Sequence, residues 1–379
     1  MQDATLKDNW QVSNRKLALT GGYAIAEALR QINPDVMAVY PITPQTPIIE
    51  SFSKKVADGL AQTKMIQVES EHSAMSACIG ASASGARTMT ASSSQGIMYM
   101  MEVIPVAAAM RLPIVMIVAN RAISGMINIH NDHSDAMAMR DFGWVQIFSE
   151  TVQEAYDNVF LALRIAEEAK LPVAPNLDGF FITHSVENLN LLSDETVRKF
   201  VGEYQPETSL FDFDNPVTYG ALALPDSYMD IRLELDEAMD RVPSVFKRVV
   251  DDFAEISGRQ YDFIEEYRTE GAEKIVVAMG SVAGTIKDAV DNLRERGEKV
   301  GLVKIKLFRP FPYERVGLVL KNAREIIVMD KNLSIGGRQV LENDIVQAVG
   351  SNEGVRSVVY GLGGRDVFVK EIEEILGGN

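Results

Sequence analysis

Short apolar runs alternate with helix-like stretches along most of this chain, and that alternation limits the possible folds more than any other feature. The N-terminal part holds four runs typical of buried strands, at 36–40, 65–68, 87–90 and 113–119. Stretches with helical spacing lie near 21–31, 46–58, 71–84 and 95–111. Strands that alternate with helices of this length indicate βαβ units, in which helices cover both faces of a parallel sheet. The sequence therefore predicts an α/β fold.

The same alternation continues to the end of the chain. A helix is predicted over 152–169 and a strand over 172–178. Further strands follow at 274–279, 300–305, 325–330 and 355–360, with helices at 284–296 and from the glycine pair at 336–337 to about 349. We expect a first domain over 1–202, a connecting segment over 203–264 and a smaller α/β domain over 265–379.

The connecting segment carries most of the negative charge of the chain. Residues 201–270 contain 17 acidic and 6 basic residues, a net charge of −11. Three prolines within 203–226 predict an ordered or half-ordered connector. Apolar residues then recur every three or four positions, which predicts a helix that Pro243 would kink or restart. A solvated linker and helix face is the simplest interpretation, and a docking surface for a basic partner is the alternative.

Composition excludes several classes of protein. The chain has 379 residues, with 37 Lys and Arg against 53 Asp and Glu, so its formal net charge is −16. Binding to nucleic acid is not expected, because it requires a basic surface. A single cysteine cannot supply a disulfide, a four-cysteine zinc site or an iron–sulfur cluster. No apolar run approaches the roughly 20 residues of a membrane span, and the first ten residues lack a signal pattern, so we expect a reducing, cytoplasmic compartment.

Four polar loops follow the predicted strands of the first domain, at 41–47, 69–73, 92–96 and 120–125. In open parallel sheets, ligands gather at the carboxyl ends of the strands, in the loops that follow them. None of these loops has the glycine pattern of a Walker or Rossmann phosphate site. The candidate functional residues are therefore sought in these loops by their own chemistry.

Two of the loops contain candidates for which two interpretations stay open. Thr43 lies in a stretch with three prolines in seven residues, so its backbone is stiff and its hydroxyl and amide could hold an anion or a carbonyl. A rigid turn with Thr46 as a helix N-cap explains the same residues equally well. Glu71 begins a helix rich in Ala, Ser and Gly, where it is either a partner of the helix dipole or a buried functional acid.

The other two loops carry a cation and a small polar run. Arg121 directly follows a very apolar strand, where a guanidinium suits bidentate binding of a carboxylate or phosphate. A structural salt bridge is the alternative. Ser94 and Gln95 lie in a loop that can present amides to an anion, which is a weak signal.

Histidines and aspartates cluster at 130–135. Their spacing matches no standard zinc pattern, so no metal site is predicted and a hydrogen-bonded polar loop is favoured. The lone cysteine, Cys78, lies on the small-residue helix and is interpreted as a buried packing residue.

Together and in this order, these loops resemble one family. The main motifs are YPITPQTP at 40–47, VESEHSAMSACIGASASGART at 68–88, SSSQG at 92–96 and RLPIVMIVANRAISGMINIHNDHSD at 111–135. Further segments that fit are LDGFFITHSVE at 177–187, KLFRPFP at 306–312 and YGLGGRD at 360–366. The chain resembles the alpha subunits of multisubunit 2-oxoacid:ferredoxin oxidoreductases, most closely those that act on pyruvate. The resemblance spans nearly the whole chain.

The resemblance implies a fold, a reaction and partners. The fold would be the pyrimidine-binding domain of thiamine diphosphate enzymes, followed by a smaller transketolase C-terminal-like domain. The reaction would convert a 2-oxoacid, CoA and oxidised ferredoxin to acyl-CoA, CO2 and reduced ferredoxin, or run in reverse, and only in the complex. A beta subunit would hold the diphosphate and Mg2+, and [4Fe-4S] clusters would lie in partner subunits, which include gamma and ferredoxin-like delta chains. The complex would be a dimer of heteromers.

The resemblance also implies roles for single residues. Glu71 matches the glutamate that hydrogen-bonds the aminopyrimidine ring of thiamine diphosphate and favours its imino tautomer. Thr43 matches a threonine that contacts the 2-oxoacid, and Arg121 matches the arginine that binds the substrate carboxylate. Ser94, Gln95 and His133 match stretches near the active site, without individual roles.

Several alternatives stay open at this stage. The motifs are more typical of pyruvate enzymes than of 2-oxoglutarate enzymes, but relatives that use 2-oxoisovalerate or phenylglyoxylate share much of the pattern. A subunit of a non-redox, thiamine-dependent 2-oxoacid decarboxylase is one rival. A non-catalytic assembly subunit is another, and the intact set of Thr43, Glu71 and Arg121 argues against it.

Overall fold

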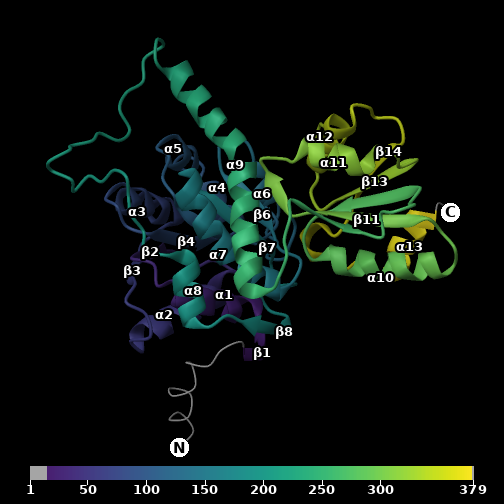
Figure 1. Ribbon diagram of the computed structural model, residues 1–379, viewed down its shortest axis with the longest axis horizontal. Coiled ribbons are helices and arrows are strands. Elements are labelled where there is room, and N and C mark those ends of the chain that lie inside the picture. Colours follow the sequence, from purple (N-terminus) through teal and green to yellow (C-terminus); the bar gives the residue numbers. More distant parts are fainter. Residues whose placement is uncertain (1–14, 378–379) are drawn as a thin grey trace, which may run out of the picture.

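Two sheets, each packed against helices, form the two lobes of the molecule (Figure 1). The computed structural model describes residues 15–377, and the N-terminal stretch that was searched for a signal pattern lies outside this range. Within the described range, no helix is long and apolar enough to cross a membrane. The α/β fold predicted from the alternating pattern is confirmed.

The larger lobe contains a seven-stranded sheet with the order β12-β6-β7-β5-β4-β2-β3. Six of its strands are parallel: β2 (Val36–Val39), β3 (Lys64–Gln67), β4 (Thr88–Ser92), β5 (Val115–Asn120), β6 (Val145–Phe148) and β7 (Val173–Asp178). The seventh, β12 (Leu307–Arg309), comes from the distal part of the chain and pairs antiparallel with β6, which the sequence did not predict. A separate antiparallel pair joins β1 (Arg15–Thr20) to β8 (Val186–Leu191).

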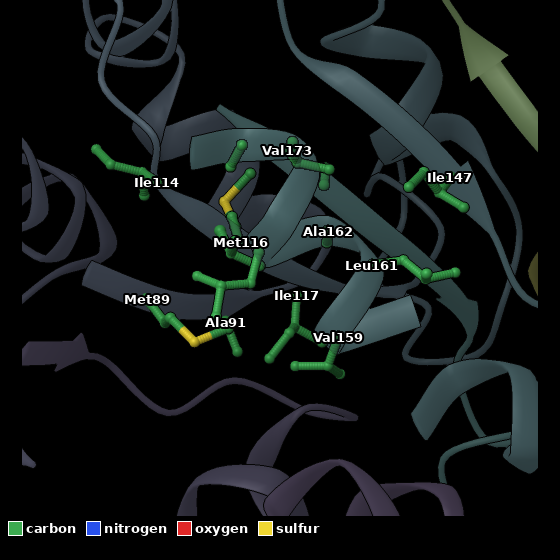
Figure 2. Close-up of a cluster of buried hydrophobic side chains, with 14 of the residues drawn as sticks. Met89, Ala91, Ile114, Met116, Ile117, Ile147, Val159, Leu161, Ala162 and Val173 are labelled. Carbon is green, nitrogen blue, oxygen red and sulfur yellow. The ribbon is translucent and has the colours of Figure 1, made fainter. Parts of the chain in front are cut away.

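The central strands of this sheet are buried along their whole length. Every residue of β4, β5 and β7 is buried, because helices cover both faces of the sheet. Figure 2 shows the apolar side chains that fill this core, among them Met89 on β4, Met116 on β5 and Val173 on β7. Cys78 is fully buried in the same core, as expected for a packing residue.

Eight helices accompany this sheet among the described residues: α1 (Gly21–Ile32), α2 (Thr46–Ala57), α3 (Glu71–Ala83), α4 (Ser94–Met100), α5 (Ile104–Ala109), α6 (Ser134–Ala138), α7 (Val152–Ala169) and α8 (Asp194–Val201). The single helix predicted over 95–111 is wrong, because it is divided into α4 and α5. Pro105 lies in the first turn of α5, where its missing N–H and fixed φ suit a helix start but not a helix interior.

The smaller lobe contains a five-stranded sheet with the order β14-β13-β10-β11-β9. Four strands are parallel, namely β10 (Lys274–Ala278), β11 (Val300–Ile305), β13 (Glu325–Asp330) and β14 (Val355–Val359), and β9 (Ile264–Tyr267) is antiparallel to β11. The helices of this lobe are α10 (Val282–Glu295), α11 (Tyr313–Leu320), α12 (Val340–Val349) and α13 (Val369–Gly377), with a short 3-10 turn, η1 (Leu362–Gly364).

A 30-residue helix, α9 (Tyr228–Ser257), packs against α7 and leads from the connecting segment to the smaller lobe (Figure 1). Its buried side chains recur every three or four positions: Leu235, Ala238, Val242, Val245, Phe246, Val249, Val250 and Phe253. The helix predicted here is confirmed, but it runs through Pro243 as one element instead of restarting. Burial of the same apolar stripe on both sides of Pro243 outweighs the local cost of proline, which is about 3 kcal/mol in a helix interior.

A buried network of acids and lysines joins the two lobes. The ammonium of Lys304, on β11, lies 2.5 Å from Glu150 Oε2 and 2.8 Å from Glu154 Oε1, and it also pairs with Glu265. These three acids are close enough together to hold a cation, and the lysine ammonium lies among them. Burial alone would raise the pKa of Glu154, but Lys306 and Lys304 lower it to about 2. The network therefore stabilises the contact between the lobes through charge.

Candidate active site

The sheet order brings the loops with the candidate residues to one edge of the larger lobe. Thr43 lies between β2 and α2, and Glu71 is the first residue of α3, which follows β3. Ser94 begins α4 directly after β4, and Arg121 comes directly after β5. Because these four strands are parallel, all of these residues lie at the same carboxyl edge.

The carboxylate of Glu71 is buried without a polar side-chain partner. Ser70 caps α3 by accepting a hydrogen bond from the backbone N–H of Ser73 at 3.2 Å, so Glu71 is not needed as the cap. In residues 15–377, no side chain donates a hydrogen bond to the carboxylate of Glu71, and the residue as a whole is only 7% exposed. Burial raises its pKa above the ordinary value. A carboxyl in this state is suited to share a proton with a bound ligand.

Gly96, in the first turn of α4, lies directly against Glu71. A Cβ atom at this position would lie 2.8 Å from Oε1 of Glu71 and would also collide with the hydroxyl of Ser92. Within the described chain, the hydroxyls of Ser92 and Ser93 are buried and lack a hydrogen-bond partner. Buried polar groups are normally satisfied, so these hydroxyls and the Glu71 carboxyl are groups that a ligand would complete. The SSSQG motif pointed to this loop, but not to the contact with Glu71.

Arg121 is a buried cation held by carbonyl oxygens. The residue is only 6% exposed. Its Nε donates a hydrogen bond to the carbonyl of Asn128 at 3.0 Å, and its Nη1 donates one to the carbonyl of Thr43 at 3.0 Å. Over residues 15–377, no carboxylate forms an ion pair with this guanidinium, so the structural salt bridge considered from the sequence is not present there. Burial lowers the pKa of Arg121, but an arginine stays charged at neutral pH. Its charge is available to an anionic ligand.

Asp135 links the loops that carry Ser94 and Arg121. Its carboxylate accepts hydrogen bonds from the backbone N–H of Ser94 at 3.0 Å, of Arg121 at 2.9 Å and of Ala136 at 2.8 Å, and from the side chain of Asn120 at 3.0 Å. Burial raises the pKa of Asp135 to about 6, although these donors oppose the shift. The cluster of histidines and aspartates is visible in the sequence, but this role of Asp135 is not.

Ser94 and Gln95 are fixed by the same network. Ser94 has a positive φ of 44°, and its hydroxyl donates to the carbonyl of Ala122 at 2.5 Å. The side-chain oxygen of Gln95 accepts from the backbone N–H of Ser124 at 2.8 Å. Both residues therefore hold the loop after Arg121 in place, and the strained backbone at Ser94 is typical of a functional site.

Thr43 has an exposed side chain, and its backbone carbonyl is the group that contacts Arg121. The alternative turn with Thr46 as N-cap is wrong in its detail. The N-cap of α2 is Gln45, and its side chain instead donates to the carbonyls of Tyr40 at 3.0 Å and Ala91 at 3.1 Å. These two bonds tie the proline-rich loop to the ends of β2 and β4.

His133 lies in a different cluster, at the contact between the lobes. Its Nε2 lies 2.8 Å from Asp178 Oδ1, and Asp178 also pairs with Lys331 at 3.1 Å and accepts from the hydroxyl of Ser281 at 2.6 Å. Burial alone would raise the pKa of Asp178, but Lys331 and His133 hold it well below its usual range. The ring of His133 is thus bonded to an acid that itself binds the second lobe, and it forms no hydrogen bond to the residues around Glu71 in the described structure.

The second lobe also contacts the loop that supports Arg121. The side chain of Asn128 donates to the carbonyl of Gly363 at 3.0 Å, and the backbone N–H of Gly364 donates to the carbonyl of Asn131 at 2.7 Å. The carbonyl of Asn128 accepts a hydrogen bond from Arg121, so Asn128 links the guanidinium to the YGLGGRD segment. The sequence contained both motifs but no signal that they meet.

This arrangement defines a class of protein. Residues 27–251 match the protein family described as "Pyruvate flavodoxin/ferredoxin oxidoreductase, thiamine diP-bdg". Residues 272–372 match the family described as "Pyruvate:ferredoxin oxidoreductase core domain II". The larger lobe is therefore a thiamine-diphosphate-binding domain. The chain also has the fold of a split-gene transketolase, with a TM-score of 0.55 at 13% identity over 94% of this chain and 95% of that one.

The chain belongs to the pyruvate flavodoxin/ferredoxin oxidoreductase family and is an oxidoreductase subunit. It is 51% identical over 373 residues to "Pyruvate synthase subunit PorA" of Thermotoga maritima, which covers 96% of this chain and 95% of the relative. It is 47% identical to the subunit of the same name from Methanocaldococcus jannaschii, over 94% and 93% of the two chains. It is also 41% identical to "Ketoisovalerate oxidoreductase subunit VorA" of Pyrococcus horikoshii, over 95% and 92%.

A solved structure shares the fold over nearly the whole chain. The 2-oxoglutarate:ferredoxin oxidoreductase from Magnetococcus marinus matches with a TM-score of 0.74 at 18% identity. The match covers 96% of this chain and 65% of that one, so this chain spans about two thirds of the length of its structural relative.

Proposed function

We propose that this chain supplies one half of the active site of a pyruvate:ferredoxin oxidoreductase and that another subunit completes it. The observation that carries the proposal is the pair of unsatisfied charged groups at one sheet edge. Glu71 is a buried carboxyl without a side-chain partner in the described chain, and Arg121 is a buried guanidinium bonded to carbonyls alone. A 2-oxoacid and a basic cofactor ring are the ligands that such groups recognise.

The residues fit thiamine diphosphate. Gly96 leaves room for the carboxyl of Glu71 to lie against α4, and the hydroxyl of Ser92 has no partner in the described chain. Glu71 would hold a proton at its carboxyl and donate it to a ring nitrogen, and its raised pKa favours this exchange. When bound, the cofactor supplies the electron sink needed for loss of CO2 from a 2-oxoacid.

Arg121 would orient the substrate. Its Nε and Nη1 are held by the carbonyls of Asn128 and Thr43, and its Nη2 has no hydrogen-bond partner among residues 15–377. The guanidinium is thus fixed in place with one donor group directed elsewhere, which suits the carboxylate of a small acid. Thr43 would add a contact from its exposed side chain.

Pyruvate is the favoured substrate because the relatives with 51% and 47% identity are named pyruvate synthase subunits. The 41% match to a ketoisovalerate oxidoreductase subunit keeps a branched-chain 2-oxoacid as the second candidate. The assay described below also tests phenylglyoxylate as a substrate, and it distinguishes a non-redox decarboxylase from the oxidoreductase.

Partner chains would supply the remaining groups. We place the diphosphate and Mg2+ site in a beta subunit and the [4Fe-4S] clusters in beta or ferredoxin-like delta subunits, with a gamma subunit, CoA and ferredoxin completing the reaction. The lone Cys78 is fully buried, and burial raises the pKa of its thiol to about 12, so it is unsuited to ligate a cluster. A reducing cytoplasmic setting is part of the same proposal.

The test is an assay of the intact complex, purified without oxygen, with pyruvate, 2-oxoglutarate, 2-oxoisovalerate and phenylglyoxylate in turn. CoA-dependent reduction of ferredoxin with pyruvate as the best substrate is expected. A colourless complex that releases CO2 without reducing ferredoxin would favour the decarboxylase. Near-normal turnover of the assembled Glu71→Ala variant would disprove the proposed role of Glu71 in the active site.

A further inference from the structure

A long acidic arm extends from the larger lobe on the side away from the candidate active site. We define the arm as residues 203–234, which comprise the linker that precedes α9 (203–227) and the first two turns of α9. In Figure 1 it runs past α3 and α5 and joins the end of α9 that extends beyond the sheet. The arm contacts the C-terminal end of α3, whereas Glu71 begins that helix, and 13 helical residues separate the two ends by about 20 Å.

The base of the arm is held by defined contacts. The backbone N–H of Leu210 donates to the carbonyl of Ala83 at 3.0 Å, and the hydroxyl of Ser209 donates to the carbonyl of Ser84 at 2.7 Å. Farther along, the hydroxyls of Thr208 and Tyr219 lie 2.5 Å apart and close the loop between them. The shape of the arm is therefore set before any partner binds.

Within that loop, a small turn presents two phenylalanines to solvent. Asp212 accepts hydrogen bonds from the backbone N–H groups of Asp214 at 3.2 Å and Asn215 at 3.1 Å, which orders the turn. Phe211 is 69% exposed and Phe213 is 82% exposed, with ring centroids 6.4 Å apart. Aromatic side chains held in this way lose little conformational entropy on binding.

The exposed apolar surface continues into α9. Leu222 is 88% exposed and Met229 is 68% exposed, and Leu235 is the first well-buried side chain of the helix. The four apolar side chains of the first two turns all lie in solvent: Tyr228, Met229, Ile231 and Leu233. At 100° per residue these positions spread over an arc of about 200°, and Asp230 and Glu234 occupy the remaining sector of the helix. An exposed apolar face of this width is normally covered by other protein.

Charge decides what kind of molecule encloses the arm. The arm contains seven acidic residues and one basic residue, Arg232. A second copy of this chain would bring a net charge of −16 against another −16, and an anionic membrane would also repel the arm. A partner with basic residues around an apolar groove is complementary to it.

We propose that the acidic arm binds another, basic subunit of the assembled enzyme, at an interface distinct from the one that completes the active site. The relatives of the chain are named as subunits, so other polypeptides are available to bind it. The proposal does not depend on the role of Glu71, because the arm lies at the opposite end of α3. The docking surface for a basic partner, which is one of the two interpretations of the acidic segment, would thus lie on residues 203–234.

The test compares two triple variants in the co-expressed complex. The arm variant carries Phe213→Ser, Leu222→Ser and Met229→Ser. The matched control carries Leu318→Ser, Ile335→Ser and Phe368→Ser, which are exposed to a similar extent in the smaller lobe. Affinity for each partner subunit is measured by native mass spectrometry after dilution. We expect the arm variant to weaken one partner by roughly tenfold or more, and the control to leave it unchanged.

Two further measurements make the outcome independent of variant folding. Hydrogen exchange of the unmodified chain, alone and in the complex, should show protection of 211–234 only in the complex. Charge reversal at Asp226, Asp230 and Glu234 to Lys should weaken the same partner and reduce the effect of salt on its binding. An arm that exchanges equally in both states, or that crosslinks to a second copy of this chain, would overturn the proposal. An equal loss of binding in the control variant would also overturn it.

Discussion

Nη1 of Arg121 donates a hydrogen bond to the carbonyl oxygen of Thr43 over 3.0 Å, joining two loops that are 78 residues apart in the sequence. The bond makes the two proposed substrate contacts into one unit, because a shift of either loop moves the other. The guanidinium is fixed on its second side by the carbonyl of Asn128. Neither partner neutralises its charge.

Replacing Arg121 by Lys should therefore impair substrate binding while the charge is kept. A lysine ammonium is a point charge and cannot contact both carbonyls and a carboxylate with the geometry of a planar fork. We expect kcat/KM for the 2-oxoacid to fall by about 10- to 100-fold, mainly through KM, in steady-state assays of the complex. Arg338→Lys, at an exposed position, is the control, and an unchanged KM in Arg121→Lys would contradict the role.

Replacing Glu71 by Gln should remove the proton that the carboxyl shares with the cofactor ring. The change keeps the size of the side chain, so assembly should be retained. Groups that move a proton in this way contribute roughly 10^2- to 10^4-fold, and we expect kcat to fall by this order. The exposed Glu102→Gln variant should retain full activity. If Glu71→Gln turned over normally, the carboxyl would have only a structural role.

Gly96→Ala should disturb the site without unfolding the protein. Its Cβ would lie 2.8 Å from Oε1 of Glu71, so the carboxyl must move away from its present position. We expect a large loss of turnover. We also expect overpacking to lower the free energy of unfolding by roughly 1–3 kcal/mol. Gly80→Ala on α3 is a matched control, because nothing lies within 4 Å of its Cβ position and alanine favours a helix. Loss of activity in both variants would argue against a specific contact.

Asn128→Ala should show that the second lobe positions Arg121. The side chain of Asn128 donates to Gly363 at 3.0 Å and accepts from the backbone N–H of His130 at 2.7 Å, and both bonds would be lost. Because the loop would loosen while Arg121 remains, we expect KM for the 2-oxoacid to rise by roughly 3- to 10-fold with a smaller change in kcat. Asn128→Asp, which keeps the acceptor, should recover part of the effect. The exposed Asn292→Ala change serves as control, and a loss confined to kcat would count against positioning.

Glu154→Gln should destabilise the contact between the lobes. Removing one partner from a buried ion pair costs about 3–5 kcal/mol, whereas the exposed pair of Lys370 and Glu374 should be worth less than about 1 kcal/mol when tested by Glu374→Gln. The pKa of Glu154 is lowered from an ordinary value of 4.5 to about 2. Its contribution to stability is thus fully present above pH 4.5 and is lost as the pH falls from 4.5 towards 2. Thermal melting at pH 7 and pH 3 checks this, and a difference between wild type and variant that stays constant with pH would contradict it.

Local patterns were sufficient for much of the fold. Apolar strands such as β5 and amphipathic helices such as α7 were predicted with bounds close to those observed, because burial on both faces or along one stripe leaves a direct period in the sequence. The interruption between α4 and α5 was missed although Pro105 marks it. The antiparallel strand β12 was missed because three residues are too few to show a period, and because its partner β6 lies 160 residues away.

The sequence by itself determined the α/β alternation, the loops at the carboxyl ends of the strands and the family to which they belong. Only the tertiary structure decided which of these residues meet. It places Glu71 against Gly96, bonds Arg121 to Thr43 and Asn128, and directs His133 to Asp178 and the second lobe. These contacts depend on sheet order, which sets β5 between β4 and β7. Periodicity reports the burial of each element, but the neighbour of each strand is set by how the whole core packs, and so the meeting of distant loops cannot be read from local spacing.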